Sequence, residues 1–590
     1  MTIASTTGGR PLPGHVTARL RDHLDRIYGP GVAAGTLPRL VGMLESVEHR
    51  PPREQLFDET DVLLIAYGDQ VREPDQPPLA TLRSFLTAHV GDVVSGLHLL
   101  PHYPWTSDDG FAVVDYTAVD PSLGEWRHVE ELAGDFRLMF DAVVNHTSVA
   151  SPWFVRWRCG DRDYADFYLA IDPATDVRSV VRPRTSPLLT PFWTSDKGVR
   201  SVWTTFSADQ VDLNYANPEV LLAVTEVLLS YVAHGAGLLR LDAIAFLWKE
   251  LGTTCLHLPQ THEVIRLWRT VLDAVAPGTL IVTETNVPHA ENITYFGDGT
   301  DEAHLVYQFP LPPLTLAAFH AGDVTRLREW AATLPPPSPQ ATFLNFLASH
   351  DGVGLRPVEG LLGMDEIDRL CAAVEARDGR VSYRTSGDGS VSPYELNTVY
   401  FEALAPAAAD ETLDRQINRF SSAHAILLAL AGVPAIYFNS LFGSRNWPEG
   451  ADHTGRARVI NRQRYSRAAL EARLSDPGSL RHAVLNRMRT LIEARMREPA
   501  FHPNAAQHVF DAGTAHFAVQ RTSVSGDRTV VCLQDVSGRP GRVRAIAPDR
   551  LPGGSVLVDV LDRSEFTTEA DGVFDVDIPA YGVRWLRLAR

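Results

Sequence analysis

The chain has 590 residues, enough for three or four units at about 150 residues per domain, although a single barrel can hold about 250 or more. Its 54 basic and 72 acidic side chains give a net charge of −18, the wrong sign for a surface that neutralises nucleic-acid or membrane phosphates. A hydrophobic fraction of 45% and a charged fraction of 21% argue against a disordered or fibrous chain.

The N-terminal stretch MTIASTTGGRPLPGHVTARL has no cationic start followed by an apolar run, and nowhere do about 18 apolar residues follow one another. The sequence therefore predicts neither an export signal nor a membrane span. The four cysteines, Cys159, Cys255, Cys371 and Cys532, form no CxxC pair, so neither a disulfide framework nor a zinc site is indicated. Reduced thiols favour a cytoplasmic location.

Apolar residues at helical spacing run from about residue 15 to 50, so residues 1–60 are expected to form an N-terminal helical extension. From residue 61, eight apolar or β-branched runs recur, most of them separated by stretches long enough for a helix. The runs are DVLLIAYGD, GLHLLPHYP, LMFDAVVNH, GLLRLDAIAF, TLIVTETN, HLVYQFPL, TFLNFLASHD and VPAIYF. They predict an α/β fold, a (β/α)₈ TIM barrel, over residues 61–146 and 207–497.

Two intervals interrupt this alternation of predicted strands and helices. Residues 147–206 are predicted as a short, loop-rich inserted subdomain B after the third strand, and residues 354–408 as a long lid-like loop before the last strand. LPPPSP at 334–339 is typical of a rigid connector. Short alternating runs split by Gly and Pro predict a C-terminal antiparallel β-domain over residues 498–590.

Three carboxylates, Asp242, Glu284 and Asp351, stand at or just beyond the predicted fourth, fifth and seventh strands. Each alone is more often a helix cap, but the carboxyl ends of barrel strands meet at one face. A retaining enzyme that breaks a glycosidic bond needs an acid and a carboxylate about 5 Å apart, which neighbouring strand ends can supply. Arg240 points the same way as Asp242 by strand alternation and would keep that carboxylate ionised, unless it forms an ion pair inside the barrel.

The motifs DAVVNH, RLDAIAF, TETN and FLASHD resemble, in order and spacing, the four motif regions of the α-amylase family, glycoside hydrolase family 13. QVDLNYANP resembles a further motif of that family. The resemblance implies that Asp242 is the nucleophile that forms a covalent glucosyl-enzyme. It makes Glu284 the general acid and then base, and Asp351 the stabiliser of the transition state. His146 and His350, at the same face, are expected to donate to sugar hydroxyls, although singly each is more often structural.

HLLPHYPWTSDDGF and LDAIAFLWKELGTTC are similar to segments of the sucrose phosphorylase subfamily. This similarity implies that Asp108 and Phe111 hold the glucosyl unit and that Phe246 completes an aromatic platform. RPR and INRQRY also match in type, which makes Arg184 and Arg462 candidates for the phosphate and substrate side. In a phosphorylase, phosphate rather than water attacks the intermediate, so the acceptor site must attract a dianion and exclude water. Arg356 lies on another predicted active-face loop. The alternative for both Arg184 and Arg356 is a solvated arginine on the surface.

The acceptor side departs from sucrose phosphorylase. SPYELN carries Pro393, Tyr394 and Glu395 where that subfamily has an Asp, Tyr and Gln arrangement, so different acceptor hydroxyls are expected. Together with the helical extension, this segment resembles the glucosylglycerate phosphorylase branch, which releases α-glucose 1-phosphate and D-glycerate. Phosphorylases of sucrose, sucrose 6′-phosphate or glucosylglycerol are the nearest alternatives, followed by an α-glucoside hydrolase and a non-catalytic carbohydrate-binding barrel.

Neither a cofactor nor a metal is implied. The sequence has no GxGxxG or Walker-type loop, and the chemistry requires none. Asn145 matches a calcium-ligand position of many α-amylases, but no Asp cluster completes a site, so a structural Asn bonded to loop backbone is expected. The expected partners are the α-glucoside, inorganic phosphate and glucose 1-phosphate, with no nucleic acid or membrane and a possible homodimer.

Overall fold

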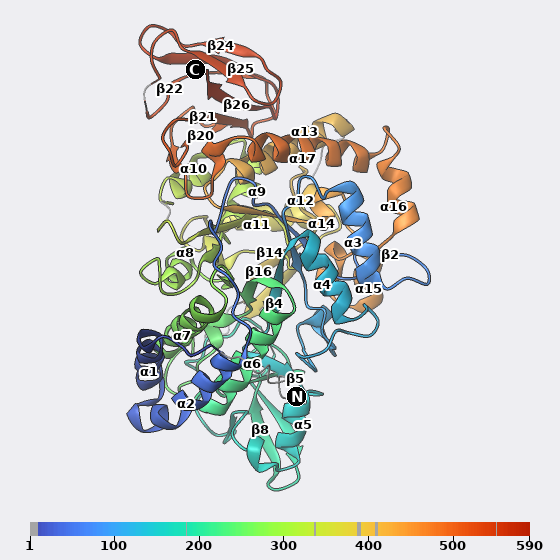
Figure 1. The fold of residues 1–590 in the computed structure, drawn as a ribbon. Coiled ribbons are helices and arrows are strands. Elements are labelled where there is room, and N and C mark those ends of the chain that lie inside the picture. Colours follow the sequence, from blue (N-terminus) through green and yellow to red (C-terminus); the bar gives the residue numbers. More distant parts are fainter. Residues whose placement is uncertain are drawn as a thin grey trace.

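A closed barrel of eight parallel strands forms the centre of the computed structural model (Figure 1). The structure describes residues 10–184, 186–334, 338–385, 391–406, 411–549 and 551–589. Each of the eight predicted runs overlaps one barrel strand. In chain order the strands are β1 (Leu63–Ala66), β3 (Gly96–Leu99), β4 (Arg137–Ala142), β10 (Ala236–Leu241), β11 (Leu280–Thr283), β12 (Leu305–Tyr307), β13 (Thr342–Phe346) and β17 (Val433–Tyr437).

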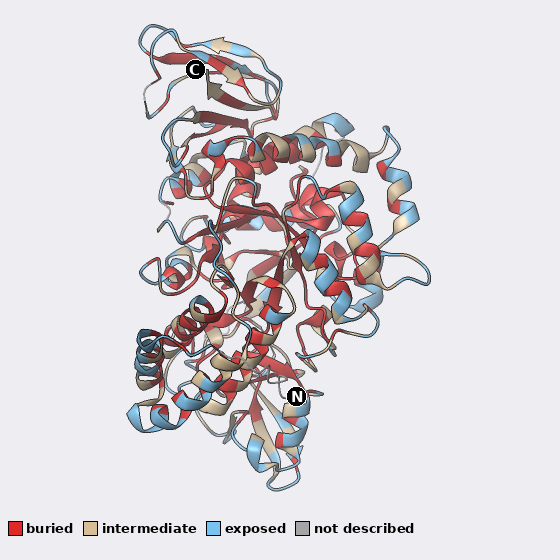
Figure 2. Ribbon diagram, in the orientation of Figure 1, coloured by how far each residue is buried: buried red, intermediate tan, exposed pale blue. Residues whose placement is uncertain are grey.

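Helices surround the barrel, and Figure 2 shows buried strands at the centre with exposed residues on the outer helix faces. The strands are buried on both sides and are therefore mostly apolar along their length rather than alternating between apolar and polar residues. The long outer helices are α3 (Pro78–His89), α4 (Trp126–Asp135), α6 (Pro218–Ala233), α7 (Pro259–Val275), α9 (Leu311–Ala321), α13 (Leu413–Ala429) and α17 (Leu480–Met496). Shorter ones are α8 (His289–Asn292), α10 (Thr325–Ala331), α12 (Tyr400–Ala403), α14 (Phe438–Leu441), α15 (Pro448–Thr454) and α16 (Arg467–Leu474).

The strand ends position the predicted carboxylates. β10 ends one residue before Asp242, β11 ends one residue before Glu284, and β13 ends five residues before Asp351. The register pairs Arg240 of β10 with Asp141 of β4, so these two side chains meet in the layer just below the strand ends. All three carboxylates therefore lie at the carboxyl end of the barrel.

The N-terminal extension consists of α1 (Gly14–Tyr28) and α2 (Pro30–Ser46), which pack on the outside of α7 and α6. Buried His23 of α1 contacts Glu263 of α7 at 2.6 Å and Thr270 at 3.0 Å. The leading residues 1–9, on which the prediction about an export signal rests in part, lie outside the described residues.

The insertion after the third barrel strand contains more regular structure than a loop-rich segment. It holds α5 (Pro152–Arg158) and an antiparallel sheet of β6 (Ala170–Ile171), β8 (Gly198–Trp203) and β7 (Leu189–Thr194). At its base, β5 (His146–Ser148) pairs with β9 (Gln210–Asp212). This base fixes His146 and Gln210 beside the barrel end.

The segment before the last barrel strand is not a long loop, which corrects the prediction. It contains α11 (Met364–Glu375) and a sheet in the order β14 (Val353–Gly354), β16 (Val391–Asn397), β15 (Arg380–Thr385). SPYELN lies in β16 as an ordered strand, because its ladder with β15 and β14 satisfies its backbone groups. GDGS in this segment and PPP of the connector lie outside the described residues.

The C-terminal residues form two packed antiparallel sheets at the end of the molecule opposite the insertion (Figure 1). One contains β19 (Ala506–Val509), β20 (His516–Thr522), β21 (Thr529–Asp535), β26 (Val583–Leu588), β23 (Val556–Asp559) and β24 (Glu565–Thr567). The other pairs β22 (Gly541–Ile546) with β25 (Val573–Ile578). All four cysteines are free, and no described helix is long and apolar enough to cross a membrane.

Candidate active site

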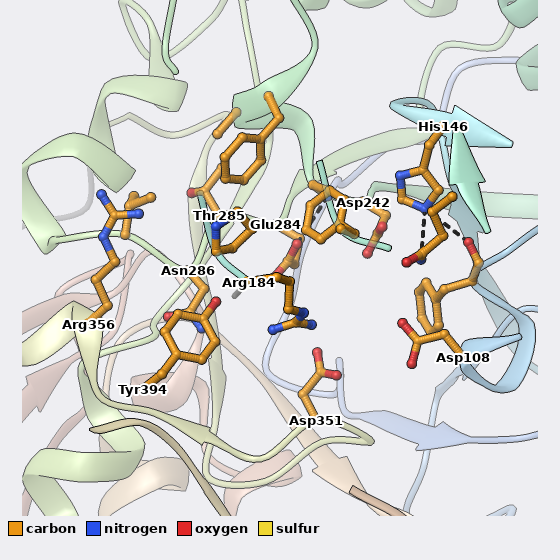
Figure 3. A pocket seen from close by; sticks show the side chains of 18 of the residues that line it. Asp108, His146, Arg184, Asp242, Glu284, Thr285, Asn286, Asp351, Arg356 and Tyr394 are labelled. Atoms are coloured by element: carbon orange, nitrogen blue, oxygen red, sulfur yellow. Dashed lines mark hydrogen bonds between the residues drawn. The ribbon is translucent and has the colours of Figure 1, made fainter. Parts of the chain in front are cut away.

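A cavity opens at the carboxyl end of the barrel strands, and Figure 3 shows its lining. Ten of the thirteen predicted site residues line it: Asp108, Phe111, His146, Arg184, Asp242, Phe246, Glu284, His350, Asp351 and Tyr394. The other three, Arg240, Glu395 and Arg462, are buried behind that lining. Further lining residues are Pro183, Phe206, Gln210, Ala243, Ala245, Thr285, Asn286, Val287, Arg356 and Arg458.

Arg240 joins the carboxylates at the base of the cavity. Its Nη1 donates to Asp242 Oδ1 at 2.9 Å and to Asp141, while its Nη2 lies 3.9 Å from Glu284 Oε2. His98 contacts the other oxygen of Asp141 at 2.8 Å. The arginine is therefore an ion-pair hub inside the barrel and a contact of Asp242 at the same time.

Asp242 and Glu284 have shifted acidities. Burial raises the pKa of the Glu284 carboxyl; Arg240 opposes this shift, and nearby Asp351 adds to it. Burial also raises the pKa of Asp242, with Arg240 opposing and Glu284 adding to the rise. Both carboxyls are therefore harder to ionise than in water, and a charge on Glu284 further opposes ionisation of Asp242.

A backbone contact links the same two residues. Ala243, directly after Asp242, has a left-handed backbone with φ 51°, which is uncommon for alanine. This conformation turns its N–H toward Glu284, whose Oε2 accepts the hydrogen bond at 3.1 Å. The sharp turn at the end of β10 therefore anchors the carboxyl that follows β11.

Two guanidiniums and the imidazole of His350 surround Asp351. Arg458 Nη1 is 2.5 Å from its Oδ1, Arg462 Nη2 is 3.6 Å from that atom, and His350 Nε2 is 3.6 Å from its Oδ2. Although burial alone raises the pKa of Asp351, the guanidiniums of Arg458 and Arg462 hold it well below its usual range. Asp351 is thus the permanently ionised carboxylate of the three.

At one end of the cavity, aromatic rings and histidines form the wall. Phe111 stacks on His350 with centroids 4.8 Å apart, and Phe246 meets Phe206 edge to face at 5.4 Å. Burial lowers the pKa of His350 to about 3, so its imidazole is neutral, and its buried Nδ1 has no partner among the described residues.

His146 stands at that end as well, but both of its ring nitrogens have protein partners. Its Nε2 donates to the Phe111 carbonyl at 3.0 Å, and its Nδ1 lies 3.3 Å from the amide of Asn145. His146 would have to give up one of these contacts to donate to a sugar hydroxyl, and that role stays a prediction for both histidines.

Asp108 reaches the cavity from a strained turn. Asp108 and Asp109 both have left-handed backbones, with φ 56° and 50°, and Gly110 has φ 113°. Arg462 holds this turn from behind, with Nη1 2.6 Å from Asp109 Oδ2, and also donates through Nε to the His350 carbonyl at 2.7 Å. Arg462 is thus a buried support for the turn rather than part of the cavity wall.

Glu395 was expected to face the acceptor, but it lies behind the cavity lining. It is 2% exposed, and its two oxygens accept from Arg458 Nη2 at 2.8 Å and Nε at 3.0 Å. The side chain that lines the cavity there is Arg458, which sequence reasoning missed. Its one available signal was its place one helical turn before Arg462, which does not reveal which guanidinium faces the cavity.

Asn145 bonds to side chains, not to loop backbone as predicted. Its Nδ2 donates to Asp212 Oδ2 at 3.0 Å, and its Oδ1 accepts from Lys249 Nζ at 2.8 Å. The ammonium also lies 3.0 Å from Asp212 and 3.3 Å from the Leu247 carbonyl. A calcium ion does not fit this donor set, because a buried cation already faces both oxygens. Among the described residues, no group of three or more His, Cys, Asp or Glu side chains could hold a metal.

Replacing Lys249 with methionine is expected to lower the free energy of unfolding by about 3 to 5 kcal/mol, because Asp212 then loses its buried countercharge. Urea unfolding of the purified protein measures the change. The double variant Lys249→Met/Asp212→Asn should recover part of the loss, whereas equal losses in both variants would contradict an ionic origin.

The closed barrel and its carboxylates around Arg240 define an α-amylase-type catalytic barrel. Residues 93–352 match the family described as "Alpha amylase, catalytic domain". The sucrose 6F-phosphate phosphorylase of Thermoanaerobacter thermosaccharolyticum superposes with a TM-score of 0.71 at 22% identity, over 86% of this chain and 98% of that one. At this identity the match shows the fold alone.

Relatives that are similar in sequence show which branch of this family the chain resembles most. A glucosylglycerate phosphorylase of Allomeiothermus silvanus is 48% identical over 90% of this chain and 95% of the relative. A sucrose phosphorylase of Agrobacterium vitis is 28% identical over 77% of this chain and 91% of its own length. The chain belongs to the glucosylglycerate phosphorylase branch of the α-amylase family.

Proposed function

We propose that the protein catalyses the phosphorolysis of 2-O-α-glucosylglycerate to α-glucose 1-phosphate and D-glycerate, with retention at the anomeric carbon. One observation carries this proposal: a single cavity holds a carboxyl pair joined by Arg240 and, beside it, the guanidiniums of Arg184 and Arg356. The first group suits glycosyl transfer, and the second suits anionic acceptors. The relatives named above support the choice of substrate.

In the first half of the reaction, an Asp242 oxygen attacks the anomeric carbon of the glucosyl unit. The bond from that carbon to O2 of glycerate breaks, and Glu284 gives its proton to the departing oxygen. The direct contact of Arg240 with Asp242, at 2.9 Å against 3.9 Å for Glu284, favours the charge on Asp242 and the proton on Glu284. Asp351 stabilises the positive charge that develops on the ring.

In the second half, a phosphate oxygen attacks the same carbon and breaks the ester to Asp242, while Glu284 takes a proton from phosphate. Two inversions give net retention, so the product is the α anomer. Asp108, Phe111, His146, Phe246 and His350 would surround the glucosyl unit, with Arg462 holding the turn of Asp108. Arg184, whose guanidinium lies 5.8 Å above the Tyr394 ring, is our candidate for binding phosphate.

The first test of this proposal is a substrate panel. Purified protein is given glucosylglycerate, sucrose, sucrose 6′-phosphate or glucosylglycerol, with and without phosphate, and glucose 1-phosphate and free glucose are measured. We expect phosphate-dependent glucose 1-phosphate from glucosylglycerate and at most traces from the others. The same product chiefly from sucrose would contradict the acceptor assignment, and free glucose independent of phosphate would make the protein a hydrolase. A lack of activity would favour a binding protein.

A further inference from the structure

Ion pairs divide the arginines around the cavity into two groups. Arg240, Arg458 and Arg462 each contact carboxylates of the protein. For Arg184 and Arg356, no carboxylate of the described residues lies within ion-pair distance, although both line the cavity. These two guanidiniums are thus the lining charges that remain available to an anionic ligand.

Arg356 lies at the end of the cavity away from the glucosyl-binding wall. In Figure 3, Asp108 and His146 lie on one side of Asp242 and Glu284, while Arg356, Asn286 and Tyr394 lie on the other. An acid that protonates a glycosidic oxygen sits between the sugar and its leaving group. Arg356 is therefore placed where the leaving group must be.

Unpartnered polar atoms mark the same end. Among the described residues, the buried Nε of Arg356 and the buried Oδ1 of Asn286 have no hydrogen-bond partner. Such atoms are costly unless a ligand or water satisfies them. The two residues belong to adjoining loops: a Cβ placed on Gly354, two residues before Arg356, would come within 2.6 Å of Asn286 Oδ1. The loop after β13 thus packs directly on the loop after β11.

We propose that Arg356 is the specificity-determining residue that binds the carboxylate of the glycerate unit, with Asn286 at a glycerate hydroxyl. This inference rests on the proposed function. In glucosylglycerate the carboxylate is attached to the carbon that carries the glycosidic oxygen, so it lies within a few ångströms of the Glu284 proton. A guanidinium pairs with a carboxylate through two parallel N–H groups. Glucosylglycerol, which has a neutral hydroxymethyl group in place of the carboxylate, gains nothing from this contact.

The test replaces Arg356 with glutamine and measures synthesis from glucose 1-phosphate, with D-glycerate or glycerol as the acceptor. We expect KM for glycerate to rise at least tenfold, because a charge-assisted hydrogen bond is lost, and KM for glycerol to stay within about twofold. In the opposite direction, KM for phosphate should also stay within about twofold. Arg356→Lys, which keeps the charge but not the paired donors, should fall between the two. Arg369→Gln, which removes an exposed arginine of α11 paired with Asp365, is the matched control.

Each possible outcome of this test either supports or overturns the role of Arg356. Parallel rises in KM for glycerate and phosphate would mean that Arg356 serves any anion, and unchanged constants would mean that it serves none; either overturns the inference. Equal rises for glycerate and glycerol would point to a structural defect and overturn it as well. Failure of the unaltered protein to use glycerate would instead reject the proposed function, so the two failures are distinguishable.

Discussion

Replacing Asp242 with asparagine is expected to lower kcat/KM for phosphorolysis by about 10⁴-fold or more, with the fold intact. The amide has nearly the same shape as the carboxylate but does not form the glucosyl ester, and loss of a nucleophile has effects of this order. Arg240 keeps Asp141 as its ionic partner, so the hub beneath the site is not left without a countercharge. Release of glucose 1-phosphate from glucosylglycerate measures the loss.

α-Glucosyl fluoride provides the control for this variant. Fluoride leaves without a proton, so only the nucleophile is needed to release it. The Asp242→Asn protein should give no burst of fluoride even with this activated donor. A burst equal in size to the enzyme concentration would show that another residue forms the intermediate.

Replacing Glu284 with glutamine is expected to lower kcat/KM for glucosylglycerate by roughly 10³-fold, within the range for loss of a general acid and base. With α-glucosyl fluoride, in contrast, the fluoride burst should persist, because departure of fluoride needs no acid. The fluoride burst from this one activated substrate therefore distinguishes the two variants. Loss of the burst in Glu284→Gln would contradict the assigned division of roles.

The pH profile of the unaltered protein tests the same residue. Burial raises the pKa of Glu284 above its ordinary value, and the first half-reaction requires its protonated form. The value of kcat/KM should therefore be maintained at pH values above the ordinary range for a glutamic acid and fall as the pH rises through the raised pKa. The fluoride burst should lack this alkaline fall.

The sequence predicted most of the fold and the base of the site, because both depend on local pattern. Barrel strands are short, apolar and widely spaced, and the residues after them meet at one face whatever the loops do. Asp242 and Arg240 needed no more than strand alternation to be placed together. The ordered sheet of β14, β15 and β16 was missed for two reasons. β14 is separated from its partner β16 by α11 and β15, and the Gly-rich GDGS that precedes β16 is typical of a long loop.

The positions of the side chains on the acceptor side could not be predicted from local sequence pattern. Whether Glu395 faces the cavity or holds Arg458 depends on which loop passes in front of it, and that is a property of tertiary packing. The same holds for Arg462, which matched a motif but supports the turn of Asp109. The motif resemblance placed both residues near the site, but it did not show whether each lines the cavity or is buried behind its lining.

The hydrogen bond from Ala243 to Glu284 has a consequence for how such a site can diversify. The distance between the two reacting carboxyls decides whether a glycoside-cleaving enzyme retains or inverts its anomeric centre. Here the peptide adjoining Asp242 holds Glu284, so the main chain of one turn helps to set that spacing. Arg184, Arg356 and Tyr394 come from other segments of the chain. Acceptor preference can therefore change through those segments while the stereochemistry of the reaction is inherited unchanged.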